Sequence, residues 1–167
     1  DPAKVQPSTP EGPRHFAFHP VRDILYSVNE NGCTVSAHYF DPSAGTLESF
    51  QVISTHPEGF SGENQSTAEI RITQDGRHLY ASNRGHDSLA IYRIDDDGTL
   101  AVVGHQPTEE IPRFFDIDPT GDYILAVGQE SGYLATYRID HGTGILETLE
   151  RQKVGASPLW VQFVAAG

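Results

Sequence analysis

The feature that most constrains this sequence is an internal repeat. Three segments share one order of apolar runs and turns, and their alignment superimposes Phe18, Ile72 and Ile117, which are 54 and 45 residues apart. Periods of about 40 to 50 residues with several short strands per unit are typical of β-propeller blades. The repeat therefore predicts an all-β fold, a β-propeller with about three four-stranded antiparallel blades.

Within each repeat the sequence alternates between strand-forming runs and turn residues. In the second unit we expect strands near 68–73, 78–83, 88–94 and 100–105. These runs are rich in β-branched and aromatic residues and alternate with a period of two. Turn segments such as QDGR and DDDGT separate them, and Gly and Asp supply the dihedral angles that turns need.

The repeat also predicts the domain organisation. It divides the chain into a linker at 1–12, blades at 13–56, 67–108 and 111–155, and an inter-blade loop at 57–66. Residues 157–164 align with the first strands of the first and third units, so we expect the first strand of a fourth, ring-closing blade there. Three blades cannot close a ring, and an open array leaves strand edges and apolar faces uncovered. We therefore expect a piece of a larger ring, completed by missing N-terminal blades or by another chain.

Composition excludes several partners. Asp and Glu total 23 against 11 Lys and Arg, for a formal net charge of −12, whereas nucleic acids attract basic surfaces. No run approaches the roughly 18 apolar residues of a membrane span, and the N-terminus lacks the apolar core of a signal peptide. Cys33 is the only cysteine, which suits a reducing compartment. We predict a cytoplasmic protein without nucleic-acid or membrane partners.

Polar residues that break the repeat gather at one end of the predicted blades. In an antiparallel blade, the start of the first strand and the end of the second strand lie at the same end. The residues at these positions are Arg14, His15, Glu30, Glu69, Arg84, His86, Arg113 and Gln129. First strands line the channel of a propeller, so we expect these side chains to converge on one channel mouth as a functional site. The alternative is a solvated rim with ion pairs between blades.

Neither a metal nor a cofactor is expected. His15 and His19 are four residues apart on a strand, which separates their Cα atoms by roughly 13 Å. The run 95–97 precedes Gly-Thr-Leu and fits a strand turn better than a calcium loop. No P-loop, GxGxxG or GxSxG motif occurs. The histidines that we expect simply at the surface are His38, His56, His105 and His141.

Two features keep alternatives open. Trp160 aligns with His15 of the first unit; it could stack on a ligand, although core packing is the expected role. The inter-blade loop 57–66 is longer than the other blade connections, and it could act as a lid over the channel mouth or as a packed loop.

The segments GPRHFAFHP, AEIRITQDGRHLYASNRGHDSLAIYRID and PRFFDIDPTGDYILAVGQESG resemble the lactonase family of seven-bladed propellers. The family includes the propeller type of bacterial 6-phosphogluconolactonase and the fungal carboxy-muconate lactonizing enzyme. The resemblance runs from Gly12 to about Val164, and the stretch from AEI to SNRGHDS is its most specific part. The sequence departs from the family pattern at Val127-Gly128-Gln129, where family members carry a sequence similar to Ala-Asn-Gln.

The resemblance implies a lactone hydrolase of carbohydrate metabolism that acts on 6-phospho-D-glucono-1,5-lactone without a cofactor. It implies a catalytic set of His15, Glu69, Arg84 and Arg113, with Arg14, Glu30, His86 and Gln129 as substrate-binding residues. Either His15 or Glu69 could serve as the base, and arginines could bind substrate anions or an oxyanion. A lactonizing cycloisomerase and a non-enzymatic binding scaffold are the alternatives.

Overall fold

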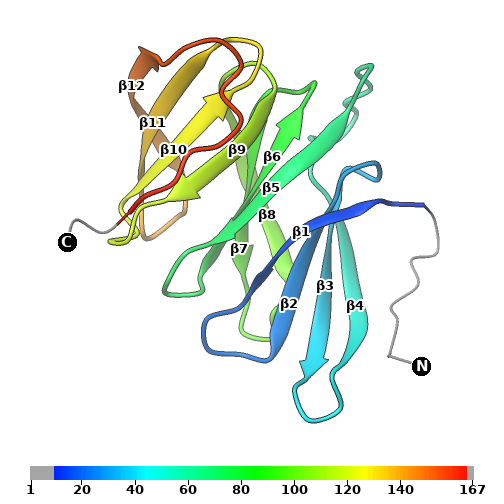
Figure 1. Ribbon diagram of the computed structural model, residues 1–167. Coiled ribbons are helices and arrows are strands. Elements are labelled where there is room, and N and C mark those ends of the chain that lie inside the picture. The colour runs from blue at the N-terminus through cyan, green and yellow to red at the C-terminus, as the bar shows by residue number, and fades with distance from the viewer. Residues whose placement is uncertain (1–9, 165–167) are drawn as a thin grey trace.

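The computed structural model describes residues 10–164, and most of the predicted linker therefore lies outside the described residues. Within this range the chain forms twelve strands and no helix (Figure 1). The predicted all-β class is confirmed, as is the division into four-stranded antiparallel sheets. No segment capable of crossing a membrane as a helix occurs among these residues.

Each sheet contains four strands that follow one another in the chain, and we call the sheets blades 1 to 3. Blade 1 contains β1 (Pro13–Phe18), β2 (Ile24–Asn29), β3 (Thr34–Asp41) and β4 (Thr46–Ser54). Blade 2 contains β5 (Ser66–Ile72), β6 (His78–Arg84), β7 (Ser88–Ile94) and β8 (Leu100–Pro107). Blade 3 contains β9 (Pro112–Ile117), β10 (Tyr123–Gly128), β11 (Tyr133–Ile139) and β12 (Leu146–Lys153).

The blades fan out from their first strands, as the open ring in Figure 1 shows. Strand β5 contacts both β1 and β9, so the first strands of neighbouring blades lie side by side. The two apolar cores lie between consecutive blades, one between blades 1 and 2 and one between blades 2 and 3. The stacking of blades therefore sets the positions of the inner strands relative to one another.

A repeated hydrogen bond ties each blade to the next. The buried Tyr26 hydroxyl donates to the carbonyl of Gly98 at 2.7 Å, and the equivalent Tyr80 hydroxyl donates to Gly144 at 2.8 Å. Both glycines have positive φ, 87° and 76°, in the turn between the third and fourth strands of the next blade. Without a Cβ, glycine adopts this conformation at little steric cost. These bonds satisfy the polar end of a large core side chain and set the stacking register.

Every innermost strand carries a β-bulge at its beginning. The pairing shifts between Pro13 and His15 in β1 and between Thr67 and Ile70 in β5, and the same shift leaves Arg113 as the extra residue in β9. A bulge adds one residue opposite a single partner, bends the strand and redirects the side chains around it. The three bulges therefore lie at the end of the blades where the sequence places its unusual polar residues.

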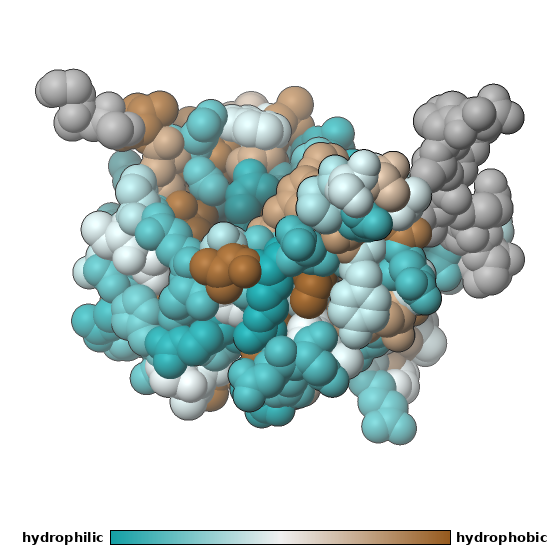
Figure 2. Space-filling model, turned by 90° about the horizontal axis from the view of Figure 1, so that it is seen from below, coloured by the Kyte–Doolittle hydropathy of each residue, from teal (hydrophilic) through white to brown (hydrophobic). Residues whose placement is uncertain are grey.

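The opposite end of the molecule differs in character. The face on the side of the β3–β4 turn is mostly hydrophilic, with small separate apolar patches (Figure 2). Its turns follow the Asp- and Gly-rich pattern of the sequence: in one, the Asp41 carboxylate accepts the backbone N–H groups of Ser43 and Ala44. The polar groups of such turns bond to one another within the turn, whereas the unusual polar residues lie at the bulged end.

The predicted strand at 157–164 does not form in the structure. This segment runs alongside β9, where the Phe163 N–H donates to Asp116 at 3.3 Å and the Trp160 ring lies 3.7 Å from the Phe114 ring, centroid to centroid. A strand requires a hydrogen-bonded neighbour, and the described residues supply none on that side. The expectation that Trp160 packs in the core is also wrong, since the residue is 61% exposed.

Candidate active site

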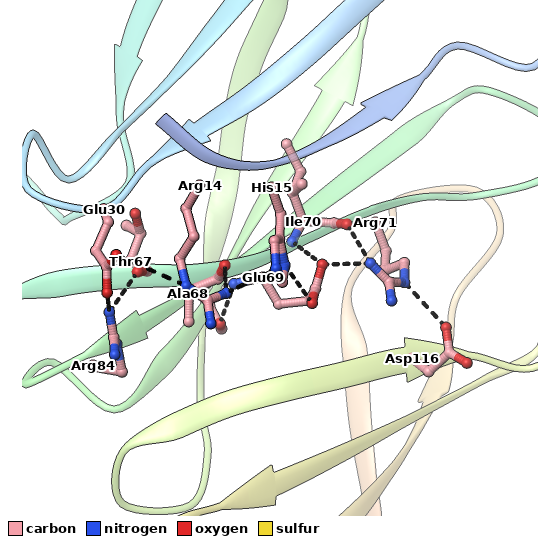
Figure 3. A network of polar contacts seen from close by, with 11 residues as sticks. Arg14, His15, Glu30, Thr67, Ala68, Glu69, Ile70, Arg71, Arg84 and Asp116 are labelled. Carbon is pink, nitrogen blue, oxygen red and sulfur yellow. Dashed lines mark hydrogen bonds and ion pairs between the residues drawn. The ribbon is translucent and has the colours of Figure 1, made fainter. Parts of the chain in front are cut away.

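The candidate active site lies where the bulged ends of β1, β5 and β9 meet (Figure 3). Regular strands point consecutive side chains to opposite faces. At the bulge of β1, however, Arg14 Nη1 lies 3.2 Å from Nδ1 of its neighbour His15. The bulges thus gather adjacent polar side chains at one channel mouth, which alternation alone would separate.

Glu69 is the fully buried charged group of the site, with 0% of its surface exposed. One carboxylate oxygen lies 2.8 Å from Nδ1 of His15, a residue of the neighbouring blade. The other oxygen accepts the backbone N–H of Ile70 at 3.0 Å and forms an ion pair with Arg71. The bulge releases the N–H of Glu69 itself from the sheet ladder, and this group donates to the Ser82 hydroxyl at 3.0 Å. Burying a carboxylate is costly unless it is paired in this way.

Arg71 extends the network to the third blade. Its Nε donates to an oxygen of Asp116 at 3.1 Å, and its Nη1 donates to the carbonyl of Ile70 at 2.9 Å. The guanidinium also lies over the Phe114 ring, 4.9 Å from the centroid. His15, Glu69, Arg71 and Asp116 therefore form one chain of polar contacts across three blades (Figure 3).

A second cluster, centred on Glu30, lies beside the first. Glu30 forms ion pairs with Arg84 and, at 3.9 Å, with Arg14. Arg84 donates in addition to the carbonyl of Thr67 at 2.9 Å, and Arg14 donates to the carbonyl of Ala68 at 2.5 Å. The hydrogen bond from Arg84 and the nearby positive charges hold the pKa of the Glu30 carboxyl below its ordinary value, although burial opposes the shift.

Arg113 is the cation of the site without a partner of its own. It makes no hydrogen bond or ion pair with any residue of the described range, yet its charge acts on both Arg14 and Glu30. Burial and the like charges of Arg84 and Arg113 lower the pKa of the Arg14 guanidinium, whereas Glu30 opposes this shift. Three guanidinium groups share one mouth with a single carboxylate between them, an arrangement suited to an anionic ligand.

The backbone before Arg113 is strained. Ile111 has a φ of 55°, in the left-handed region that β-branched residues avoid, whereas the equivalent position in blade 1 is Gly12 with a φ of 67°. The Ile111 N–H donates to the carboxylate of Asp87 at 2.9 Å, which helps to hold this conformation. Such strain clusters at functional sites because the surrounding structure must over-determine it.

A small cavity opens beside the buried pair. It has a volume of about 240 Å³ and is lined by Arg14, His15, Phe16, Glu69, Arg71 and Trp160. His15 is partly accessible in this cavity, with 34% of its side chain exposed. Two larger hollows lie on the open face of blade 1, where Arg14 and His15 are part of the lining, and between blades 1 and 2 beside the inter-blade loop; Glu69 lines neither of them.

Two residues of the sequence-based set lie apart from this network. His86 Nδ1 lies 2.7 Å from the Ser88 hydroxyl, and its ring packs edge-on against Phe60, 4.5 Å between centroids. Gln129 is half-buried; its backbone N–H donates to the carbonyl of Ile111 at 3.0 Å, and its side chain bonds to no described residue. The structure brings together the other six: Arg14, His15, Glu30, Glu69, Arg84 and Arg113.

The histidine assignment needs correction. His38 is buried, with its Nε2 3.2 Å from the Ser27 hydroxyl, and His56 and His105 are half-buried around His86. Only His141 is exposed, as expected. Across residues 10–164, no group of three or more His, Cys, Asp or Glu side chains is arranged to hold a metal ion. Phe60, at the centre of the inter-blade loop, packs on this histidine cluster, which favours the packed-loop alternative over the lid.

Sequence reasoning missed Arg71 and Asp116. They occupy one repeat position, the next position on the same side of the inner strand after Glu69 and Phe114, where blade 1 has Ala17. Opposite charges at equivalent positions of neighbouring repeats are a readable signal. This signal lies one inward-facing position beyond the repeat-breaking residues at the strand start.

Among known proteins, the model of a family described as "Lactonase, 7-bladed beta-propeller" matches residues 1–163. A 6-phosphogluconolactonase of Pectobacterium carotovorum is 43% identical over 155 residues, which cover 92% of this chain and 46% of that protein. The chain thus spans about half the length of the curated relatives it matches.

Solved structures agree in fold. A crystal structure from Bacteroides uniformis superimposes with a TM-score of 0.87 at 37% identity, covering 96% of this chain and 46% of that one. The periplasmic gluconolactonase of Pseudomonas aeruginosa superimposes with a TM-score of 0.84 at 28% identity, covering 92% of this chain and 43% of its own.

Proposed function

The chain belongs to the lactonase family of seven-bladed β-propellers, and from this premise we propose that it carries the active site of a lactone hydrolase. The leading substrate is 6-phospho-D-glucono-1,5-lactone, which hydrolysis converts to 6-phosphogluconate. The single observation that carries the proposal is the contact of 2.8 Å between the half-exposed His15 and the buried Glu69, next to three arginines.

The geometry supports different roles for the two candidate bases. Both oxygens of Glu69 are occupied and the group is fully buried, so it cannot reach a water molecule in the channel. His15 is partly exposed, and a Glu69 carboxylate that accepts from Nδ1–H leaves Nε2 free of a proton. His15 is therefore the general base, and Glu69 orients the ring and stabilises the imidazolium that forms.

The reaction follows from these positions. Nε2 of His15 removes a proton from water, and the oxygen of that water forms a bond to the lactone carbonyl carbon. The carbonyl oxygen becomes an oxyanion, which Arg14 stabilises because its Nη1 lies only 3.4 Å from Nε2. Collapse of this intermediate breaks the bond to the ring oxygen. The departing alkoxide takes the proton from His15 and becomes the hydroxyl group of the acid.

The substrate anion binds at Arg113. Among residues 10–164 nothing occupies the donors of Arg113, whereas Glu30 already neutralises much of the charge of Arg84. A guanidinium offers a planar pair of N–H groups that matches a phosphate or a carboxylate. Arg113 thus receives the phosphate of the substrate, and Arg84 and Glu30 shape that part of the mouth.

The proposal includes completion of the ring. Large apolar side chains are exposed on the open face of blade 1, next to a hollow of about 610 Å³. They are Phe16, Phe18 and Val52. Exposed apolar faces of this kind indicate a missing neighbour, and we propose that further blades of the same protein, or of another chain, cover them. Activity is therefore measured on the longest polypeptide that the gene encodes.

The test is hydrolysis of 6-phosphogluconolactone and of unphosphorylated gluconolactone by His15→Gln, Glu69→Gln and Arg113→Ala. We expect kcat to fall about 10²- to 10⁴-fold in the first two variants, the usual contribution of a general base. Arg113→Ala raises KM for the phosphorylated lactone alone. Rates equal to those of the unmodified protein in both His15→Gln and Glu69→Gln would refute the proposal.

The alternatives are separated in the same experiment. A lactonizing cycloisomerase interconverts muconates and lactones but leaves the sugar lactones intact, and a binding scaffold turns over neither class. A cytoplasmic location remains part of the proposal; it is supported by the single cysteine, Cys33, which is buried and free. Cell fractionation tests it directly, since the Pseudomonas relative is described as periplasmic.

A further inference from the structure

Arg71 lines the same cavity as His15 and Glu69, but its charge is already committed. Its guanidinium forms ion pairs with two carboxylates, Glu69 and Asp116, and donates to the carbonyl of Ile70. Three of the five N–H donors of an arginine are thereby used. A cation that faces two carboxylates does not attract a third anion as Arg113 does, so a role in binding the substrate phosphate is disfavoured.

One contact of Arg71 acts directly on the carboxylate of Glu69. Its ion pair engages the same oxygen that accepts the Ile70 N–H, which leaves the second oxygen to face His15. The position of Arg71 is itself set by two contacts, the Phe114 ring under the guanidinium and the ion pair with Asp116. Only 29% of the Arg71 side chain is exposed, so its surroundings restrict the conformations of the guanidinium group.

We propose that Arg71 is a positioning residue that holds the Glu69 carboxylate in the orientation required to fix the His15 ring, and that Asp116 of blade 3 sets Arg71. The inference rests on the proposed function of this site and deepens it. The orientation of His15 on blade 1 then depends on Asp116 of blade 3. The connection runs through the ion pairs of Arg71 with Asp116 and Glu69 and through the contact of Glu69 with His15. The three blades must therefore stack correctly before the base is aligned.

The chain offers a matched control for Arg71. Arg151, on the outer strand β12, also pairs with a buried carboxylate, Glu109, at 2.5 Å, and it also lies over an aromatic ring, Tyr133, at 3.7 Å. It belongs to no part of the network in Figure 3. Arg151→Met removes the same kind of interaction outside the site.

The kinetic experiment compares Arg71→Met, Arg71→Lys and Arg151→Met in the longest polypeptide that the gene encodes. We expect kcat of Arg71→Met to fall about 10²-fold with KM unchanged, because loss of alignment in a catalytic group has an effect of that size. Arg71→Lys retains part of the rate, and added guanidinium ion restores part of it to Arg71→Met. Arg151→Met keeps the full rate. A rise in KM without a change in kcat, or no response to guanidinium, would overturn the positioning role.

A spectroscopic experiment tests the inference even if no lactone is hydrolysed. Nitrogen-15 NMR of the imidazoles, with His15→Gln used for assignment, reports which ring nitrogen of His15 carries the proton. We expect the proton on Nδ1 in the unmodified protein and in Arg151→Met, and a shift of the population toward Nε2 in Arg71→Met and, to a smaller extent, in Asp116→Asn. An unchanged His15 spectrum in a folded Arg71→Met would refute the inference, whereas absence of lactonase activity with the expected spectra would refute only the proposed function.

Discussion

Replacement of Glu69 by Gln and by Ala separates two contributions of this side chain, its hydrogen bonding and its charge. The side chain is completely buried and its carboxylate makes three contacts, with His15, Ile70 N–H and Arg71. Gln retains the shape and one carbonyl oxygen, which can still accept from Ile70 and Arg71. Ala removes every acceptor and leaves the N–H of Ile70 buried without a partner.

The expected magnitudes differ by about a factor of three. An unpaired buried backbone N–H costs about 1–3 kcal/mol. Hydrogen bonds to a charged group contribute about 1.5–3 kcal/mol, and the lower end applies because about a third of the His15 and Arg71 side chains is exposed and Arg71 keeps Asp116. We expect a loss of about 3 kcal/mol for Glu69→Ala. For Glu69→Gln we expect about 1 kcal/mol, the difference between charged and neutral hydrogen bonds.

Urea unfolding followed by circular dichroism measures both losses on the chain itself. With a slope of about 2 kcal/mol per molar urea, the midpoints should fall by about 1.5 M and 0.5 M. Glu147→Gln, which removes the solvent-exposed ion pair with Arg138, serves as the control and should leave the midpoint nearly unchanged. Equal losses in the two Glu69 variants would refute the reasoning, because hydrogen bonding to the buried carboxylate would then contribute nothing.

Three further predictions concern stability. Gly98→Ala should lower the free energy of unfolding by about 1–2 kcal/mol in a thermal melt, since φ is 87° and the added Cβ would meet the side chain of Ile24. Arg84 lowers the pKa of Glu30 below its ordinary 4.5, so the stability from this pair is present above that pH and is lost as the pH falls; Glu30→Gln should remove this acid dependence. Burial and two neighbouring histidines lower the pKa of His56 below 6.5, so stability is full above pH 6.5 and declines below it; His56→Phe should flatten that decline in pH-dependent melts.

The pattern in the sequence was sufficient to predict the blades, because the boundaries of a repeat can be read from the alignment of its copies. Alternation, turn residues and a period of about 45 residues predict four strands per unit, and the strand at 88–94 agrees with β7 in the structure. The segment 157–164 forms no strand among the described residues for the opposite reason. Its composition suits a strand, but strand formation depends on a neighbour that composition cannot supply.

The functional end could be located from the sequence, whereas its contacts could not. Antiparallel order places the start of the first strand and the end of the second at one end. Five of the eight selected residues contact one another there, and the charge of Arg113 acts on two of them. His86 was assigned with them by position alone, yet its side chain turns toward Phe60 and the outer histidines. Two residues beyond the end of β6, the direction of a side chain follows from the loop and not from strand alternation.

The sequence by itself determined the fold class, the blade boundaries and the end of the blades where charged groups collect, because a repeat and its exceptions are visible in one dimension. Only the tertiary structure decided which of those groups touch. The bulges displace the side-chain alternation by one residue, and the stacking of blades then brings Glu69 to His15 on one side and Arg71 to Asp116 on the other. Both effects depend on packing between units, which a pattern within one unit does not contain.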